Sequence, residues 1–280
     1  MRKTHTTPYP ELDVVLESHA EKIQQALGDN IIGFYSQGSL AIGDFDLTSD
    51  VDFVVITKED LKEDQVHAVQ KVHTQTCSQD SRWVKHLEYS FFPLQLFRTH
   101  SSPYTDGSAD TSEERKLWYF DNGSPVIEKS DHDNTLVTRW TVRKKGKAVM
   151  GPDPKILLSP IHPDDLRREI RGTLIGWGSE VVKNPDPFKN RFYQAYFVLN
   201  YCRVLQDLEE GRITSKLEGV NWAKQHVDPT WIPLIDYCWK ERQDPDISIG
   251  QPADSEIYDQ VIDFVQYAID KGMNFQIGIK

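Results

Sequence analysis

The chain has 280 residues, which is enough for one large domain or for two ordinary domains that each bury a hydrophobic core. Its formal net charge of -11 and its isoelectric point near 5.3 argue against a protein that grips nucleic acid through the phosphates. The sequence has no C-x-x-C pair, no apolar leader and no apolar run long enough to cross a bilayer, so we expect a cytoplasmic protein with neither a zinc cluster nor a membrane span.

The first half of the chain alternates helical and strand patterns. Residues 10–27 carry apolar side chains at helical spacing and predict an amphipathic helix. Apolar runs at 31–35 and 51–56 predict strands, and the aromatic-rich segment 83–97 predicts a third. A helix is expected at 65–76, between the second and third strands. This order of elements indicates an α/β domain.

The second half of the sequence predicts only helices. After the segment VMGPDPKILLSP, in which prolines and a glycine punctuate the chain, apolar residues recur at spacings of three and four. Helices are predicted at 163–182, 188–210, 215–226, 231–242 and 254–271. We therefore expect an α/β domain over residues 1–155 and an all-α helical-bundle domain over residues 156–280.

Two aspartates, Asp50 and Asp52, begin a segment that otherwise reads as buried strand. Carboxylates in such a place are costly unless a cation meets them, and side chains at i and i+2 of a strand share one face. Magnesium is commonly held by one or two carboxylates together with the phosphates of a substrate. The pair therefore predicts a metal site, although Asp-x-Asp by itself also marks the manganese site of many sugar-nucleotide glycosyltransferases.

Other residues supply the remaining parts of a nucleotide site. Gly38 permits a close approach of the backbone to a ligand, and Ser39 offers a hydroxyl and an N–H group to a phosphate. Ser49 supplies another donor directly before the first aspartate, and Glu88, on a separate strand, is a candidate general base. Together these residues describe in-line nucleotidyl transfer, in which a metal and amide groups hold a triphosphate while a base prepares the acceptor oxygen.

Four motifs resemble those of a known family. GSLAIGDFDLTSDVDFVV (residues 38–55) resembles the signature of the polymerase-beta-like nucleotidyltransferase superfamily. LEYSFF, VMGPDP and GRITSKLEGVNWA then follow in the order found in the bacterial aminoglycoside adenylyltransferases that modify streptomycin and spectinomycin. The resemblance covers nearly the whole chain and implies an α/β nucleotidyltransferase domain with a mixed sheet, followed by the helical domain.

The resemblance also implies roles for individual residues. Asp50 and Asp52 would bind Mg²⁺, and Glu88 would be the general base. Ser39 and Ser49 would contact the triphosphate of ATP. From the helical domain, Lys216 would reach the nucleotide phosphates, while Trp118 would pack against the acceptor.

One position departs from the family pattern. The drug-modifying members carry an acidic residue where this chain has Tyr193, at the start of the helix before CRVLQDLEEG. The resemblance thus implies transfer of AMP from ATP to a hydroxyl of a small cationic or sugar-like molecule, with the acceptor left open. The alternative is a regulatory, antitoxin-like nucleotidyltransferase that modifies a partner protein. Such chains are generally shorter and lack the second domain.

Overall fold

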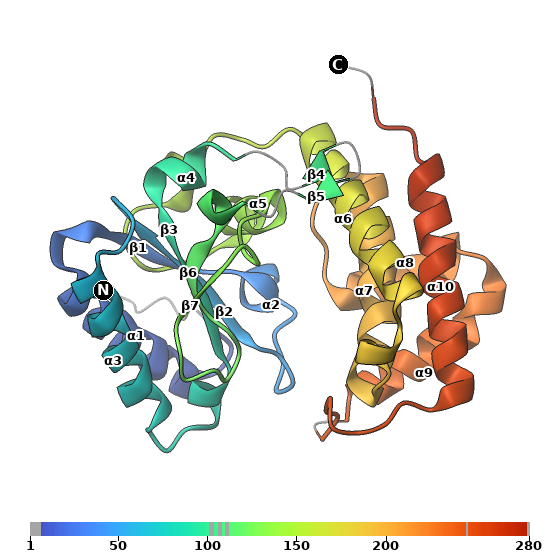
Figure 1. Ribbon diagram of the computed structural model, residues 1–280, viewed down its shortest axis with the longest axis horizontal. Helices are drawn as coiled ribbons and strands as arrows, with labels where there is room; N and C mark the ends of the chain where they lie inside the picture. The colour runs from blue at the N-terminus through green and yellow to red at the C-terminus, as the bar shows by residue number, and fades with distance from the viewer. Residues whose placement is uncertain (1–6, 101–103, 106–107, 110–111, 245, 279–280) are drawn as a thin grey trace. The chain divides into compact units, whose positions relative to one another are not determined.

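The computed structural model describes residues 7–100, 104–105, 108–109, 112–244 and 246–278. The chain forms two compact units, one made of Met1–Ser101 with Thr111–Pro160 and the other of Ser102–Asp110 with Ile161–Lys280 (Figure 1). Each unit has its own hydrophobic core and is described separately.

The first unit is built on a six-stranded sheet with the order β7-β6-β3-β2-β1-β8. In chain order the strands are β1 (Ile31–Ser36), β2 (Val51–Thr57), β3 (Leu87–Pro93), β6 (Leu117–Phe120), β7 (Glu128–Ser130) and β8 (Ala148–Met150). β2 and β3 run parallel, and every other neighbouring pair is antiparallel. The sheet is therefore mixed, which confirms the predicted fold class.

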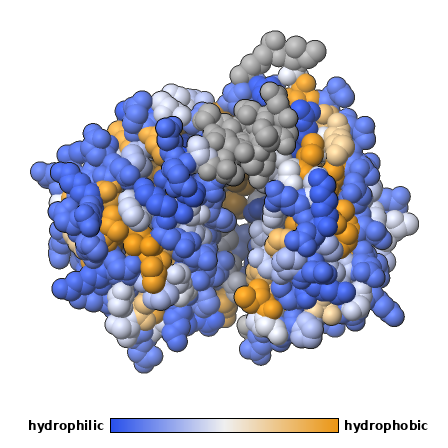
Figure 2. Space-filling model, in the orientation of Figure 1, coloured by the Kyte–Doolittle hydropathy of each residue, from blue (hydrophilic) through white to orange (hydrophobic). Residues whose placement is uncertain are grey.

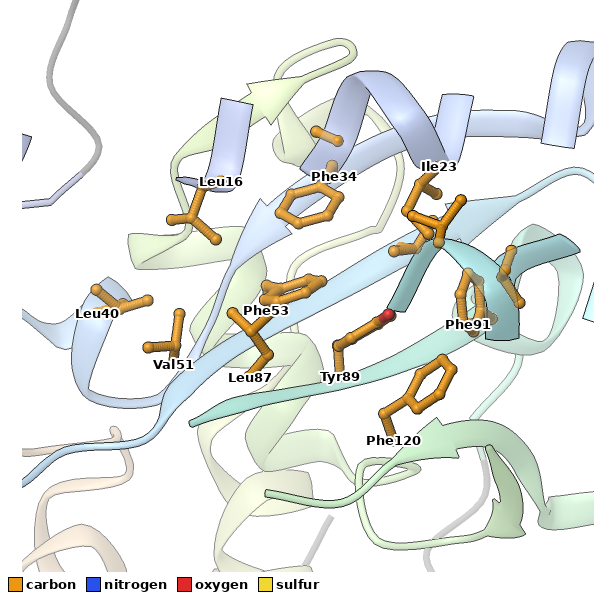
Figure 3. Packing of buried hydrophobic residues seen from close by; sticks show 14 of the residues in the cluster. Leu16, Ile23, Phe34, Leu40, Val51, Phe53, Leu87, Tyr89, Phe91 and Phe120 are labelled. Atoms are coloured by element: carbon orange, nitrogen blue, oxygen red, sulfur yellow. The ribbon is translucent and has the colours of Figure 1, made fainter. Parts of the chain in front are cut away.

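Helices cover both faces of this sheet. They are α1 (Pro10–Leu27), α2 (Gly38–Ile42), α3 (Glu63–Cys77), α4 (Leu94–Arg98) and α5 (Leu136–Lys145). The apolar faces of α1 and α3 bury one face of the sheet, where Phe34, Phe53 and Tyr89 stack across three strands with ring centroids 4.2 Å apart at each step (Figure 3). On the other face, buried Arg139 of α5 donates to the carbonyl of Phe97 at the end of α4. The parallel pair β2 and β3 is thus buried on both sides, as its nearly unbroken apolar sequence requires.

Within its described residues, the second unit is a bundle of five α-helices with a short hairpin. The helices are α6 (Pro163–Lys183), α7 (Arg191–Glu210), α8 (Lys216–His226), α9 (Ile232–Arg242) and α10 (Ser255–Asn274), and the hairpin pairs β4 (Tyr104–Thr105) with β5 (Ser108–Ala109). α7 packs against the other four helices, which explains why its buried residues lie on all sides of the helix. The predicted helical character of this half is confirmed.

Both units present mainly hydrophilic side chains on the face drawn in Figure 2. Within the described part of the chain, no helix combines the length and apolar character needed to cross a membrane.

Candidate active site

The register of the parallel pair brings two of the predicted carboxylates together. Asp52 on β2 and Glu88 on β3 are direct partners in the ladder, so their side chains lie next to each other on one face of the sheet. Asp50 precedes β2 by one residue and stands two positions before Asp52. Burial raises the pKa of Asp52 well above its usual range, and the negative charges of Glu88, Asp50 and Asp133 raise it further. Burying several carboxylates this close together becomes favourable when a bound cation compensates their negative charge.

The oxygen donors suit magnesium. In the part of the chain that the structure describes, no three His, Cys, Asp or Glu side chains converge on a single metal position. Magnesium seldom needs such a cage, because it is usually held by one or two carboxylates with phosphates and waters completing the octahedron. Asp50 and Asp52 therefore fit the Mg²⁺ that the sequence implies, with phosphate oxygens and waters supplying its remaining ligands.

The turn after β1 is fitted closely to Asp52. Gly38 has a φ of +53°, which L side chains rarely adopt, and a Cβ at this position would lie 2.7 Å from Cγ of Asp52. The backbone N–H of Gln37 donates to the carbonyl of Asp52 at 3.0 Å. Ser39 follows, and no described residue hydrogen-bonds to its half-buried hydroxyl. A glycine is thus required at residue 38 so that this turn can approach the carboxylate.

Ser49 is engaged in its own loop. Its hydroxyl donates to Oδ1 of Asp46 and accepts from the backbone N–H of Asp46, both at 3.1 Å, and its own N–H donates to the carbonyl of Asp46 at 3.2 Å. These bonds shape the turn that delivers Asp50 to the site. A contact between Ser49 and the triphosphate stays a prediction, and it would require Ser49 to exchange one of these bonds.

Glu88 has two partners that the sequence did not single out. The hydroxyl of Tyr119 on β6 lies 2.8 Å from Oε1 of Glu88, and Nε2 of His132 lies 3.3 Å from the same oxygen. The ring of His132 also stacks on that of Tyr119, with centroids 5.6 Å apart. The hydrogen bond to Glu88, followed by the charges of Asp133, Glu88 and Asp52, raises the pKa of His132 to about 9. Because 62% of the His132 side chain is exposed, solvent screens this pairing.

Two further residues complete the polar group. Buried Asp133 accepts from Nε2 of Gln37 at 3.0 Å and from the hydroxyl of Ser90 at 2.6 Å, so it links the turn after β1 to strand β3. Asn122 donates through Nδ2 to Oδ1 of Asp50. In the sequence, the segments YFDN (residues 119–122) and SDHDN (residues 130–134) each contain several polar residues next to a short apolar or strand-like stretch. This was the one sequence signal that could have pointed to Asn122, His132 and Asp133.

Trp118 does not lie with the carboxylates. In the antiparallel pair of β3 and β6, Tyr119 is opposite Ser90 and Trp118 is opposite Phe91. Ser90 and Glu88 share one face of β3, so Tyr119 occupies the carboxylate side while the indole of Trp118 packs against the apolar core on the other face. The ammonium of Lys129 lies 4.4 Å from the centre of that indole. The arrangement gives Trp118 a packing role.

Lys216 lies in the second unit as the first residue of α8. The hydroxyl of Ser215 caps this helix, and the preceding turn is held by Asp207, whose Oδ1 accepts from both the N–H and the hydroxyl of Thr214. The Lys216 ammonium lies 5.3 Å from the centre of the Tyr196 ring. The backbone at this lysine is therefore well fixed, and its contact with a nucleotide stays a prediction.

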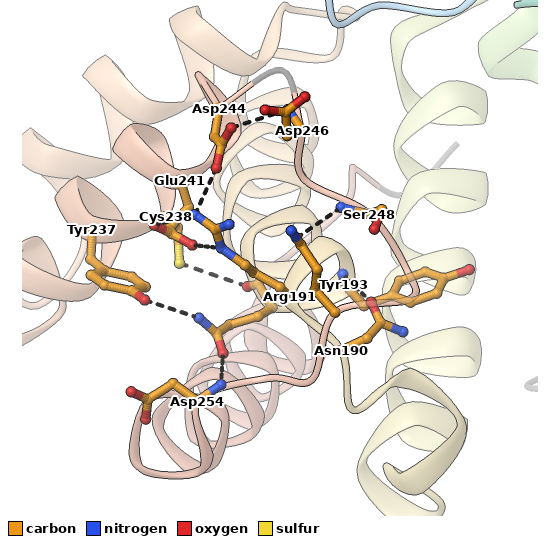
Figure 4. Close-up of polar contacts among 12 residues, drawn as sticks. Asn190, Arg191, Tyr193, Tyr237, Cys238, Glu241, Asp244, Asp246, Ser248 and Asp254 are labelled. Atoms are coloured by element: carbon orange, nitrogen blue, oxygen red, sulfur yellow. Dashed lines mark hydrogen bonds and ion pairs between the residues drawn. The ribbon is translucent and has the colours of Figure 1, made fainter.

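Tyr193 also belongs to the second unit, in the first turn of α7. Its N–H donates to the side chain of Asn190, which caps the helix (Figure 4). Its ring stacks on Phe197 with centroids 5.4 Å apart and meets Phe188 and Phe192 edge-on. Tyr193, at the position where the resemblance implies an acidic residue, is therefore part of an aromatic cluster.

Comparison with known proteins supports the same reading. Residues 16–99 match the family model described as a nucleotidyltransferase domain, and residues 156–271 match that of the aminoglycoside adenylyltransferase C-terminal domain. Spectinomycin 9-adenylyltransferases of Staphylococcus aureus strains Mu50 and N315 are each 24% identical over 223 residues, covering 78% of this chain and 80% of theirs.

A solved structure extends the likeness to the fold. The crystal structure of the spectinomycin adenyltransferase AAD(9) from Enterococcus faecialis, with ATP and spectinomycin, has a TM-score of 0.65 and 17% identity, covering 95% of this chain and 100% of that one. The two family matches follow each other in the order of the two compact units. The chain therefore belongs to the aminoglycoside adenylyltransferase-like nucleotidyltransferases and is an enzyme of that family.

Proposed function

We propose that the protein transfers AMP from ATP, with magnesium, to a hydroxyl group of a small cationic or sugar-like acceptor of the aminoglycoside type. The observation that carries the proposal is the direct pairing of Asp52 with Glu88 beside the turn at Gly38. This arrangement puts metal-binding oxygens, a candidate base and an approachable backbone in one place. The match to the aminoglycoside adenylyltransferase C-terminal domain favours a small acceptor over a partner protein.

The proposed division of labour follows from the contacts. Asp50 and Asp52 would hold Mg²⁺ against the triphosphate, and the bound metal would neutralise charge on the phosphates and on the departing pyrophosphate. Glu88 would take the proton of the acceptor hydroxyl. The acceptor oxygen then forms a bond to the α-phosphorus of ATP while the bond from that phosphorus to the bridging oxygen breaks. Pyrophosphate leaves with the electron pair.

The remaining predicted residues would bind substrates. The unengaged hydroxyl of Ser39, together with Ser49 and Lys216, would contact the phosphates. Tyr193 would face the acceptor and offer it an aromatic ring where drug-modifying relatives offer a carboxylate. A charge-assisted hydrogen bond typically contributes about 1.5 to 3 kcal/mol, so a strongly cationic acceptor would bind this chain less tightly. Trp118 has no part in the proposal because it packs on the other face of β6.

A pyrophosphate-release assay tests the proposal. The protein is incubated with ATP, magnesium and a panel containing spectinomycin, streptomycin, a lincosamide and free sugars. We expect release with at least one member and its loss in Asp50→Asn and Asp52→Asn, because an amide does not neutralise the cation. Exposed Asp64 of α3 provides the matched control, since Asp64→Asn should turn over normally. Either site variant keeping more than about a tenth of turnover, equivalent to about 1.4 kcal/mol, contradicts the metal assignment.

A further inference from the structure

Both partners of Glu88 meet the same oxygen. The Tyr119 hydroxyl and Nε2 of His132 lie 2.8 and 3.3 Å from Oε1, and among the described residues none is hydrogen-bonded to Oε2. A glutamate side chain has a broad terminal torsion, so one contact alone leaves the carboxylate free to rotate. Two donors on one oxygen, one from β6 and one from the segment after β7, restrict this rotation and leave the other oxygen available.

The two donors are themselves held in place. Tyr119 is 4% exposed and sits within β6, opposite Ser90 in the sheet. Burial and then the charge of Glu88 raise the pKa of Tyr119, so its hydroxyl keeps its proton and remains a donor at any physiological pH. The one hydroxyl proton of Tyr119 can be donated either to Glu88 or to Asp121, whose Oδ1 lies 3.0 Å from the hydroxyl oxygen. His132 rests on the Tyr119 ring, which limits the positions that the imidazole can take.

We propose that Tyr119 and His132 are positioning residues that hold Glu88 by Oε1 and so present Oε2 to the proton of the acceptor hydroxyl. The inference rests on the proposed role of Glu88 as general base and adds the two residues that orient it. The proton passes from the acceptor oxygen to Oε2, while Tyr119 and His132 keep their own protons throughout. His132 also places a positive charge among carboxylates whose pKa values are raised by burial, and this charge offsets part of that rise for Asp52 and Asp133.

Kinetics of single variants test the orientation. Tyr119→Phe removes only the hydroxyl, and His132→Ala removes the imidazole. Each should lower kcat on the order of tenfold or more with the acceptor that gives pyrophosphate release in the panel assay, since small misplacements of a catalytic group have large effects. KM for ATP should change little, because neither residue is placed on the nucleotide. His132→Gln, which returns an N–H donor near Nε2, should recover most of the loss.

Matched controls separate orientation from stability. Tyr35→Phe also deletes a tyrosine hydroxyl that donates one hydrogen bond, to the carbonyl of Pro152 at 2.9 Å, but it lies outside the site. It should lower thermal stability about as much as Tyr119→Phe while leaving kcat unchanged. His67→Ala, on the exposed surface of α3, plays the same part for His132. If Tyr119→Phe and His132→Ala keep the kcat of these controls, the inference is wrong.

A double-mutant cycle distinguishes this inference from the proposed function. In a Glu88→Gln background, adding Tyr119→Phe or His132→Ala should cause no further loss, because both act through Glu88. Full activity in Glu88→Gln alone would refute the base assignment itself. An inactive Glu88→Gln variant beside fully active Tyr119→Phe and His132→Ala variants would refute only the positioning role.

The pairing also has a readout that needs no acceptor. In magnesium-free protein, NMR titration of the His132 imidazole should give a pKa well above the ordinary 6.5 of histidine, and Glu88→Gln should bring it back toward that value. Asp133 and Asp52 contribute as well and remain in both proteins, so the difference reports Glu88. A His132 pKa that Glu88→Gln leaves unchanged would show that the two side chains are not paired, and would overturn the inference.

Discussion

Replacing Gly38 by alanine should disable the site without unfolding the protein. The glycine has a φ of +53°, and the added Cβ would lie 2.7 Å from Cγ of Asp52, with Oδ2 of the same carboxylate closer still. Real Cβ atoms essentially never lie within 3.0 Å of a heavy atom outside their own and the neighbouring residues, so either the turn or the carboxylate must shift. Asp52 is one of the two proposed magnesium ligands, and the shift would move it away from the metal.

The magnitude follows from two terms. The left-handed backbone costs an alanine about 1–2 kcal/mol of stability, which a unit of this size tolerates. A displacement of about 1 Å in a catalytic group can lower the rate about 10²-fold. We therefore expect Gly38→Ala to remain folded, to bind MgATP weakly and to lose at least that much turnover.

Gly43, which follows the last residue of α2, offers a control at the other end of the same helix. It has a φ of +97°, and a Cβ there would meet nothing within 4 Å. Gly43→Ala should thus show the backbone cost in urea unfolding and keep its turnover, while Gly38→Ala shows the same cost and loses turnover and MgATP binding by calorimetry. Equal turnover in the two variants would refute the proposed fit between Gly38 and Asp52.

Three further outcomes can be measured. Glu88→Gln should bind MgATP nearly normally yet lose on the order of 10²-fold in rate, and loss of MgATP binding in calorimetry would instead assign Glu88 to the metal. Burial lowers the pKa of His19 to about 3 and that of His73 to about 4, whereas both titrate near 6.5 in the unfolded chain. The unfolded state therefore takes up protons first as pH falls, so stability is full above pH 6.5 and declines toward pH 4, on the order of 1 kcal/mol per pH unit for each histidine. Urea unfolding at several pH values checks this, and an unchanged midpoint across that range would contradict it. Tyr193→Asp should tighten streptomycin binding in the presence of a non-hydrolysable ATP analogue about tenfold or more, and calorimetry showing no gain would mean that residue 193 does not face the acceptor.

Much of the fold could be predicted from the sequence because its signals are local. The helix over residues 10–27 and the five helices of the second unit carry apolar stripes at helical spacing, and the structure places them within a few residues of the predicted bounds. The third strand was expected over residues 83–97 but covers only Leu87–Pro93, because residues 94–98 form helix α4. The short strands β6, β7 and β8 and helix α5 were not predicted. Strands of three or four residues at or near a sheet edge are too short to show the alternation of apolar and polar residues that distinguishes a strand from a loop in the sequence.

The pair Asp50 and Asp52 and the turn at Gly38 could be found in the sequence because they are neighbours along the chain, and a strand fixes which of its side chains share a face. The sequence by itself therefore determined the carboxylate pair, and it indicated Glu88 as the candidate base through the motif LEYSFF. Only the tertiary structure decided which residues surround Glu88. Register between β3 and β6 puts Tyr119 on the site face and Trp118 in the core, and a slip of one residue would exchange them. His132 and Asp133 reach the site from a segment more than 40 residues away from Glu88, through contacts that no local pattern encodes.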